Sequence, residues 1–147
     1  MRGKTGVRWG RVIAAGLLTE IGAVLIIVAA ATAYKHTASP TAAEYQAFAE
    51  RAGYYVGIFG GALLAFLFSS WACRPLGGDF MINGLLVGCV GASLHVALFA
   101  ASGAGFQAAY LIADGLKLAA GALGGYLAQR HYGRAAKLRP AGERASR

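Results

Sequence analysis

Charged residues are scarce in this chain. They make up 14% of its 147 residues, whereas 57% of the residues are hydrophobic. A soluble domain of this size carries about 25% charged residues. The scarcity therefore excludes an ordinary soluble domain and indicates an integral membrane protein. Because one helical bundle uses the whole length, the sequence predicts a single domain.

Paired cysteines and the signature motifs of enzymes are also missing. Cys73 and Cys89 form no CxxC pair and fall in different apolar runs, which predicts free thiols and neither a disulfide nor a metal site. The sequence has no P-loop, GxGxxG, zinc signature or nucleophile elbow. The pattern favours a protein without cofactor or catalytic site.

The net charge of +8 would suggest a nucleic-acid partner in a soluble protein. Here the basic residues cluster just outside the apolar runs, and no basic patch is interleaved with aromatic residues. The charge is typical of membrane orientation and of attraction to anionic lipid. We therefore expect membrane lipid, and no nucleic acid, as the partner of these residues. The expected headgroup contacts are Arg8, Arg11, Arg130, Arg134, Lys137 and Arg139.

Four apolar runs are long enough to cross a hydrocarbon core of about 30 Å at about 1.5 Å rise per residue. They cover residues 12–34, 52–73, 80–101 and 106–129. Thr41 and Glu44 match a capping box, which opens an amphipathic interfacial segment, 41–51, that leads into the second run without a break. Asp79 is placed to cap the third run.

The fold prediction is all-α, an integral membrane antiparallel four-helix bundle over 12–129. A basic N-terminus (1–11) precedes it, and a basic tail (130–147) follows. Eleven of the 14 Lys and Arg residues fall on the side of the two termini, against Lys35 and Arg51 on the other side. This bias predicts that both termini are cytoplasmic. The compact, Ala- and Gly-rich style favours a bacterial inner (plasma) membrane.

Cleavage of the first run as a signal peptide is the alternative to this topology. Ala31-Thr32-Ala33 resembles a small-residue cleavage site, and cleavage would leave three spans with an external N-terminus. The run is longer than the usual core of a signal, and Glu20 interrupts it. These two features favour an uncleaved first span.

Glycine accounts for 22 residues, about twice its average usage. In lipid, small residues let helix backbones approach closely. Eight glycines recur at helical spacing and predict tight helix packing: Gly53, Gly57, Gly61, Gly84, Gly88, Gly91, Gly121 and Gly124.

Four ionisable residues lie inside the spans: Glu20, His95, Asp114 and Lys117. A charge at the bilayer centre costs roughly 2.5 to 3.5 kcal/mol on insertion scales, so such groups normally face protein or water. Counted by helix rise, the last three are roughly level, and Glu20 is a little closer to the side of the termini. The sequence therefore predicts a polar cluster inside the bundle.

Three interpretations of this cluster stay open. Asp114 and Lys117, three residues apart, can pair and act with His95 as interhelical glue. The cluster can instead form a binding or proton-handling site, or contact another membrane subunit. His95 is disfavoured as a metal or haem ligand, because Lys117 would repel a metal ion and the other histidines fall near opposite surfaces.

Glu20 has no Lys or Arg within four residues, so its partner must come from another helix or from water. Without a partner at that depth the carboxyl would favour its neutral form. The surrounding string Gly16-Leu17-Leu18-Thr19-Glu20-Ile21-Gly22 resembles the first helix of the small multidrug resistance transporters. That family has four spans and uses a membrane glutamate to exchange protons for cationic drugs, so the resemblance implies a proton-binding role for Glu20.

The opening Arg8-Trp9-Gly10-Arg11-Val12, followed by Glu20, also resembles the start of uncharacterised small bacterial membrane proteins with four helices, a resemblance that implies no activity. The leading expectation is a non-enzymatic accessory or assembly subunit, or a bundle that assembles with copies of itself. The main alternative is a small proton-coupled transporter that uses Glu20. A small membrane enzyme is the third hypothesis.

Overall fold

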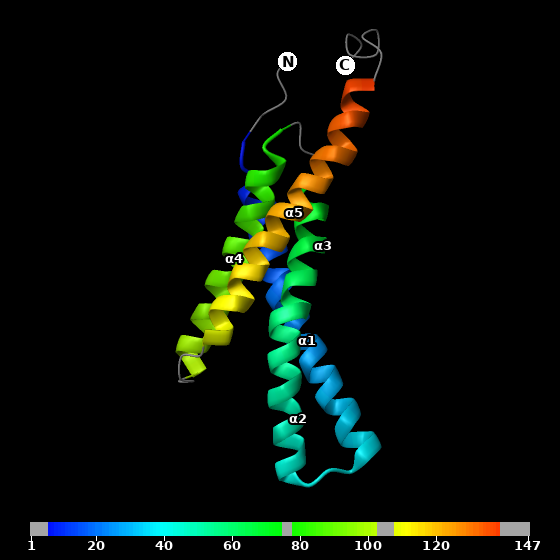
Figure 1. Ribbon diagram of the computed structural model, residues 1–147, viewed down its shortest axis with the longest axis vertical. Coiled ribbons are helices and arrows are strands. Elements are labelled where there is room, and N and C mark those ends of the chain that lie inside the picture. The colour runs from blue at the N-terminus through cyan, green and yellow to red at the C-terminus, as the bar shows by residue number, and fades with distance from the viewer. Residues whose placement is uncertain (1–5, 75–77, 103–107, 139–147) are drawn as a thin grey trace.

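The computed structural model describes residues 6–74, 78–102 and 108–138. Its helices are α1 (Trp9–Ala38), α2 (Ala42–Tyr55), the π-helical turn η1 (Val56–Gly60), α3 (Gly61–Cys73), α4 (Phe80–Ser102) and α5 (Ala108–Leu138). They pack as an all-α bundle in which α2, η1 and α3 follow one another as one long helix (Figure 1). This confirms the predicted bundle of four long apolar helices.

Four helical stretches are long and apolar enough to cross a membrane: Trp9–Ala38, Ala42–Cys73, Phe80–Ala101 and Ala108–Tyr132. Large apolar side chains cover their outer faces, as expected of a surface that contacts acyl chains. The chain is therefore an integral, multi-pass membrane protein. We call the end of the bundle where α1 begins and α5 ends the terminal end, and the opposite end the distal end (Figure 1).

The capping box predicted at Thr41 is present. The Oγ1 of Thr41 accepts a hydrogen bond from the N–H of Glu44, and the Glu44 carboxylate accepts one from the N–H of Thr41 at 2.8 Å.

Just before α4, Asp79 takes a left-handed conformation, with φ of 55°. Its carbonyl oxygen accepts from both the N–H and the Nδ2 of Asn83. The Asn83 Oδ1 accepts from the N–H of Arg8 at 2.9 Å, which ties the start of α1 to the start of α4.

Helix α5 continues to Leu138, beyond the predicted boundary at residue 129. The apolar run ends where lipid ends, but a helix ends only where its backbone is interrupted. Residues 130–138 are mostly good helix formers, and Pro140 stands shortly beyond them. The first part of the basic tail is therefore helical, while residues 139–147 lie outside the described chain.

The sequence did not predict the π-helical turn η1. The N–H of Gly61 bonds to the carbonyl oxygen of Val56, five residues earlier, so the helix widens by one residue at this point. Single π-turns inside α-helices are frequent at functional sites. This one lies midway along the second membrane span.

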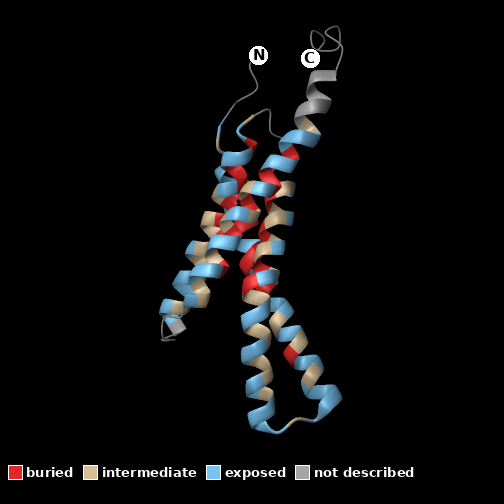
Figure 2. Cartoon of the chain, viewed as in Figure 1, coloured by how far each residue is buried: buried red, intermediate tan, exposed pale blue. Residues whose placement is uncertain are grey.

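The packed core occupies the terminal half of the bundle (Figure 2). Its buried apolar side chains come from α1, α3, α4 and α5, and they form one cluster around Val12, Ala15, Ala72 and Val87 and a second that includes Ala128 of α5. Toward the distal end the α1–α2 pair and the α4–α5 pair diverge (Figure 1). Every residue of α2 is at least partly exposed.

Glycines allow the close helix contacts of the core. A Cβ atom added at Gly121 would lie 2.5 Å from the carbonyl oxygen of Gly84 across the α4–α5 interface. One at Gly124 would lie 2.5 Å from the carbonyl oxygen of Phe66 in α3. Gly53 and Gly57 differ, because an added Cβ would meet nothing within 4 Å in the described chain. No atom of another helix in the described chain lies close to their Cβ positions, although α2 contacts α1 and η1 contacts both α1 and α5.

Candidate functional site

Lys117 is the most deeply buried charged side chain in the described part of the chain. It projects from α5 into the bundle, and 1% of its surface is exposed. Its Nζ lies 2.7 Å from the Oε1 of Glu20 in α1, which is itself only 7% exposed. Removing Lys117 would leave the buried Glu20 carboxylate without its cationic partner, and removing Glu20 would take from Lys117 its nearest carboxylate.

Asp114 extends this pair into a chain of four ionisable groups. Its Oδ1 lies 3.6 Å from the Nζ of Lys117 and 2.7 Å from the Nδ1 of His95 in α4. An ionised carboxylate can only accept hydrogen bonds, so Nδ1 of His95 carries the proton when Asp114 is charged. The structure therefore brings Glu20, Lys117, Asp114 and His95 together from three helices.

The pairing differs from the one expected from spacing alone. Asp114 and Lys117 are in contact, but each has a shorter contact on another helix. Glu20, which has no basic neighbour in the sequence, finds one 97 positions away. The long lysine side chain can cross the bundle, whereas a pair on one helix surface is limited to its own turn.

Glycines make room for the two buried charged side chains. A Cβ at Gly61 would lie 2.8 Å from Cε of Lys117, and one at Gly91 would lie 3.4 Å from Oε1 of Glu20. At Gly88 an added Cβ would lie 2.7 Å from the carbonyl oxygen of Lys117. Gly61 and Gly91 therefore lie beside the ion pair, whereas Gly88 lets α4 approach the backbone of α5. Gly61 immediately follows the π-turn.

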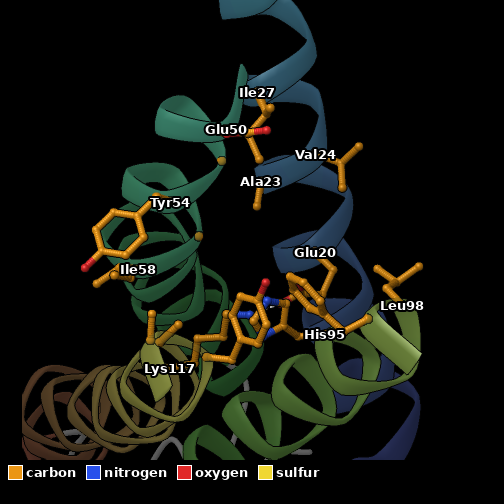
Figure 3. A pocket seen from close by; sticks show the side chains of 16 residues that line it. Glu20, Ala23, Val24, Ile27, Glu50, Tyr54, Ile58, His95, Leu98 and Lys117 are labelled. Atoms are coloured by element: carbon orange, nitrogen blue, oxygen red, sulfur yellow. Dashed lines mark hydrogen bonds and ion pairs between the residues drawn. The ribbon is translucent and has the colours of Figure 1, made fainter. Parts of the chain in front are cut away.

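A cavity of about 700 Å³ adjoins the cluster, between the diverging helix pairs. Glu20, His95 and Lys117 contribute to its wall near the packed core (Figure 3). The remaining wall is mostly apolar and comes from all four spans; it includes Val24, Ile27, Gly53, Gly57, Ile58, Leu98 and Ala113. The volume falls within the range of small-molecule sites, about 300 to 1,000 Å³.

Glu50, Tyr54 and Phe99 also line this cavity, and the sequence did not single them out for the site. Phe99 could have been found from its position four residues after His95 on the same helix. Glu50 and Tyr54 carry no such signal, because only the divergence of α2 from α5 exposes them to a shared space. Tyr110 shares its helix face with Asp114 and Lys117, and it also lines the cavity.

Three of the basic residues expected at the headgroups, Arg8, Arg11 and Arg130, lie in the described chain near the terminal end. The guanidinium of Arg11 lies over the Trp71 ring at 5.8 Å, and that of Arg130 over the Tyr126 ring at 4.9 Å. Arg8 uses its main-chain N–H to contact Asn83. Arg134 and Lys137 belong to the last turns of α5, and Arg139 lies outside the described residues. Lipid contact by these residues stays a prediction.

Comparison with known proteins adds no relative. No protein-family model matches the chain, and neither a curated protein nor a solved structure is significantly similar to it. The assignment as a membrane protein is therefore made from the sequence and the structure of this chain. It is an integral membrane protein with four candidate spans, and four ionisable side chains meet beside a cavity in its bundle.

Proposed function

We propose that the protein is a small proton-coupled transporter whose central group is the Lys117–Glu20 pair. The observation that carries this proposal is a nearly inaccessible ammonium, 2.7 Å from a carboxylate, in the wall of a cavity large enough for a small molecule. Ionisable residues inside membrane spans are expensive and commonly mark proton or substrate pathways. The resemblance of Gly16–Gly22 to small multidrug resistance transporters points the same way.

Protonation of Glu20 would change the charge of the cavity wall by one unit. Neutral Glu20 no longer compensates Lys117, which then retains Asp114 at 3.6 Å as its nearest carboxylate. Such a change can alter both ligand affinity and helix arrangement, because an effector shifts a two-state protein only through unequal interactions with the two states. Coupling would then follow from competition between proton and substrate for the same network.

Infrared difference spectroscopy tests the first requirement without a known substrate. On acidification the wild type should gain the carbonyl stretch of a protonated carboxylic acid, and Glu20→Gln should lack that band. Glu50→Gln is the matched control, because Glu50 lines the same cavity but is exposed and bonded to Gln46 instead. A band that is the same in wild type and Glu20→Gln would remove Glu20 from the mechanism.

Proteoliposomes test the coupling itself. We would trap a pH-sensitive dye inside and add tetraphenylphosphonium, choline, benzoate or phenol, which differ in charge and apolar surface. At least one probe should move protons through wild type and Glu50→Gln, but not through Glu20→Gln. Proton movement that persists in Glu20→Gln, or that is absent with every probe, contradicts the proposal.

A second candidate function is that of an accessory subunit or a self-assembling bundle. The observation in its favour is the pair Gly53 and Gly57, small residues at GxxxG spacing whose Cβ positions meet nothing within the described chain. Both glycines line the cavity, so a neighbouring membrane helix that packs on them would lie between the diverging helix pairs. Native mass spectrometry after purification in mild detergent decides this point, since a monomer without bound protein would exclude it.

The proposed orientation has both termini in the cytoplasm of a bacterium and the cavity in the half of the bundle away from them. It is supported by the charge bias of the joints and by the placement of the start of α1 and the end of α5 at one end (Figure 1). In this orientation the packed terminal half closes the cavity toward the cytoplasm. A transport cycle would then require that half to open.

A further inference from the structure

His95 is accessible from two sides. Besides the main cavity, a smaller hollow of about 220 Å³ lies between α4 and α5, toward their distal ends. The two hollows share three wall residues, His95, Phe99 and Tyr110. These three residues therefore separate the smaller hollow from the larger one.

The partition consists of three aromatic rings in mutual contact. The centroids of Phe99 and Tyr110 lie 3.7 Å apart, and those of His95 and Phe99 lie 4.9 Å apart. The centroids of His95 and Tyr110 lie 5.8 Å apart. Rotation of a side chain costs less free energy than a movement of a helix, because it leaves the backbone hydrogen bonds intact. Rotation of Phe99 or Tyr110 would join the two hollows without separating α4 from α5.

The outer side of the smaller hollow faces the surroundings of the bundle. Val96 is 59% exposed and Leu111 is 64% exposed, and both belong to the wall of the hollow. In a membrane these faces contact acyl chains. At about 220 Å³ the hollow is below the usual size of a small-molecule site, about 300 to 1,000 Å³. Its size suits an entrance better than a binding site.

We propose that this hollow is a lateral entrance through which a membrane-dissolved molecule passes between α4 and α5 into the main cavity. Phe99 and Tyr110 form the gate, and the His95–Asp114 pair supplies the polar contact at it. The inference rests on the proposed function only for the onward transport of the molecule. Entry and binding require the two hollows and the gate alone.

The chemistry of the gate specifies the class of ligand. An ion entering from lipid would pay a large desolvation penalty, so the entering molecule is uncharged and mainly apolar. Nδ1 of His95 faces Asp114, so in the neutral ring Nε2 is a hydrogen-bond acceptor. The complementary ligand group is a hydroxyl or N–H donor. Phenols and long-chain alcohols fit this description.

Photolabelling from the bilayer tests the route. The probe is a lipid-soluble phenol that carries a diazirine, used beside the same molecule without its hydroxyl. After irradiation of proteoliposomes, mass spectrometry gives the label on Ala113, behind the gate, relative to the label on Leu111, in front of it. In wild type the phenol should give a several-fold higher ratio than the matched probe.

Variants of α4 identify the entrance. Ala100→Trp fills the smaller hollow and should lower the ratio several-fold, whereas Phe99→Ala opens the gate and should raise it. Leu98→Trp is the control for entry between α1 and α4, because Leu98 lines only the main cavity. Phe59→Ala removes an equal ring from an exposed position of η1 and should change nothing. Size-exclusion profiles show whether each variant is folded.

A ratio lowered by Leu98→Trp and unchanged by Ala100→Trp would overturn the proposal, and so would equal ratios for the two probes. Glu20→Gln separates this inference from the transport proposal, because it should stop proton movement and leave the label ratio unchanged. If the label ratio responds to the gate variants but wild type moves no protons, transport alone is refuted. Proton movement with labelling that ignores the gate variants refutes the lateral entrance alone.

Discussion

Neutralising Lys117 is the most direct perturbation of the candidate site. Lys117→Met keeps most of the volume of the side chain and removes its charge. Glu20, 7% exposed, then loses the ammonium at 2.7 Å. Breaking a buried ion pair by removing one partner costs about 3 to 5 kcal/mol in proteins. We expect a loss within that range, because Lys117 is the only cationic partner of the buried Glu20 carboxylate in the described chain.

A double-mutant cycle separates the pair from the removal of a side chain. The cycle consists of Glu20→Gln, Lys117→Met and the combined variant. Contacting charged residues show coupling energies of about 0.5 to 3 kcal/mol. We expect the upper half of this range for Glu20 and Lys117, since both are buried and hydrogen-bonded. The combined variant should therefore be more stable than the sum of the single losses predicts.

A second cycle, with Asp114→Asn in place of Glu20→Gln, provides the comparison. Asp114 lies 3.6 Å from Nζ and has His95 as a closer partner at 2.7 Å. Its coupling to Lys117 should therefore be the smaller of the two. Reversible unfolding in mixed micelles, followed by circular dichroism, measures all the variants. A coupling to Asp114 equal to or larger than that to Glu20, or no coupling to either, would refute the assigned pairing.

Three further predictions concern the scaffold. Gly88→Ala should lower thermal stability in detergent, because its Cβ would lie 2.7 Å from a backbone oxygen of α5. Gly57→Ala, whose Cβ would meet nothing within 4 Å, should leave thermal stability unchanged, and equal losses in the two variants would contradict the helix contacts described. Thr41→Ala removes both hydroxyl contacts of the capping box with Glu44 and should speed amide hydrogen exchange in the first turn of α2 only; unchanged exchange there would show that the box does not hold the turn. Reporter fusions at the two termini should both report the cytoplasm; opposite locations would exclude four spans.

The fold was predictable because its signals are strong and local. Apolar runs, the spacing of the glycines and the Thr41–Glu44 box each specify structure within a few turns of helix. The end of α5 was less predictable, since hydropathy marks where a helix leaves lipid and not where it stops. A basic segment made mostly of good helix formers can continue a helix into the headgroup region.

The site was predictable in its members but not in its pairing. Helix rise places His95, Asp114 and Lys117 at similar levels, so that their meeting follows from the bundle. Which carboxylate Lys117 prefers depends on helix rotation and on the space above Gly61 and Gly91, and neither is encoded locally. The cavity depends on the divergence of the helix pairs, which no sequence period records.

The π-turn η1 connects these features physically. In a regular α-helix Gly53, Gly57 and Gly61 share one face and would meet the same neighbour. The turn widens the helix between Val56 and Gly61, which changes the rotation of the part before it relative to α3. Gly61 can then pack on Lys117 while Gly53 and Gly57 line the cavity. One long helix therefore contacts the buried ion pair through Gly61 and borders the cavity through Gly53 and Gly57.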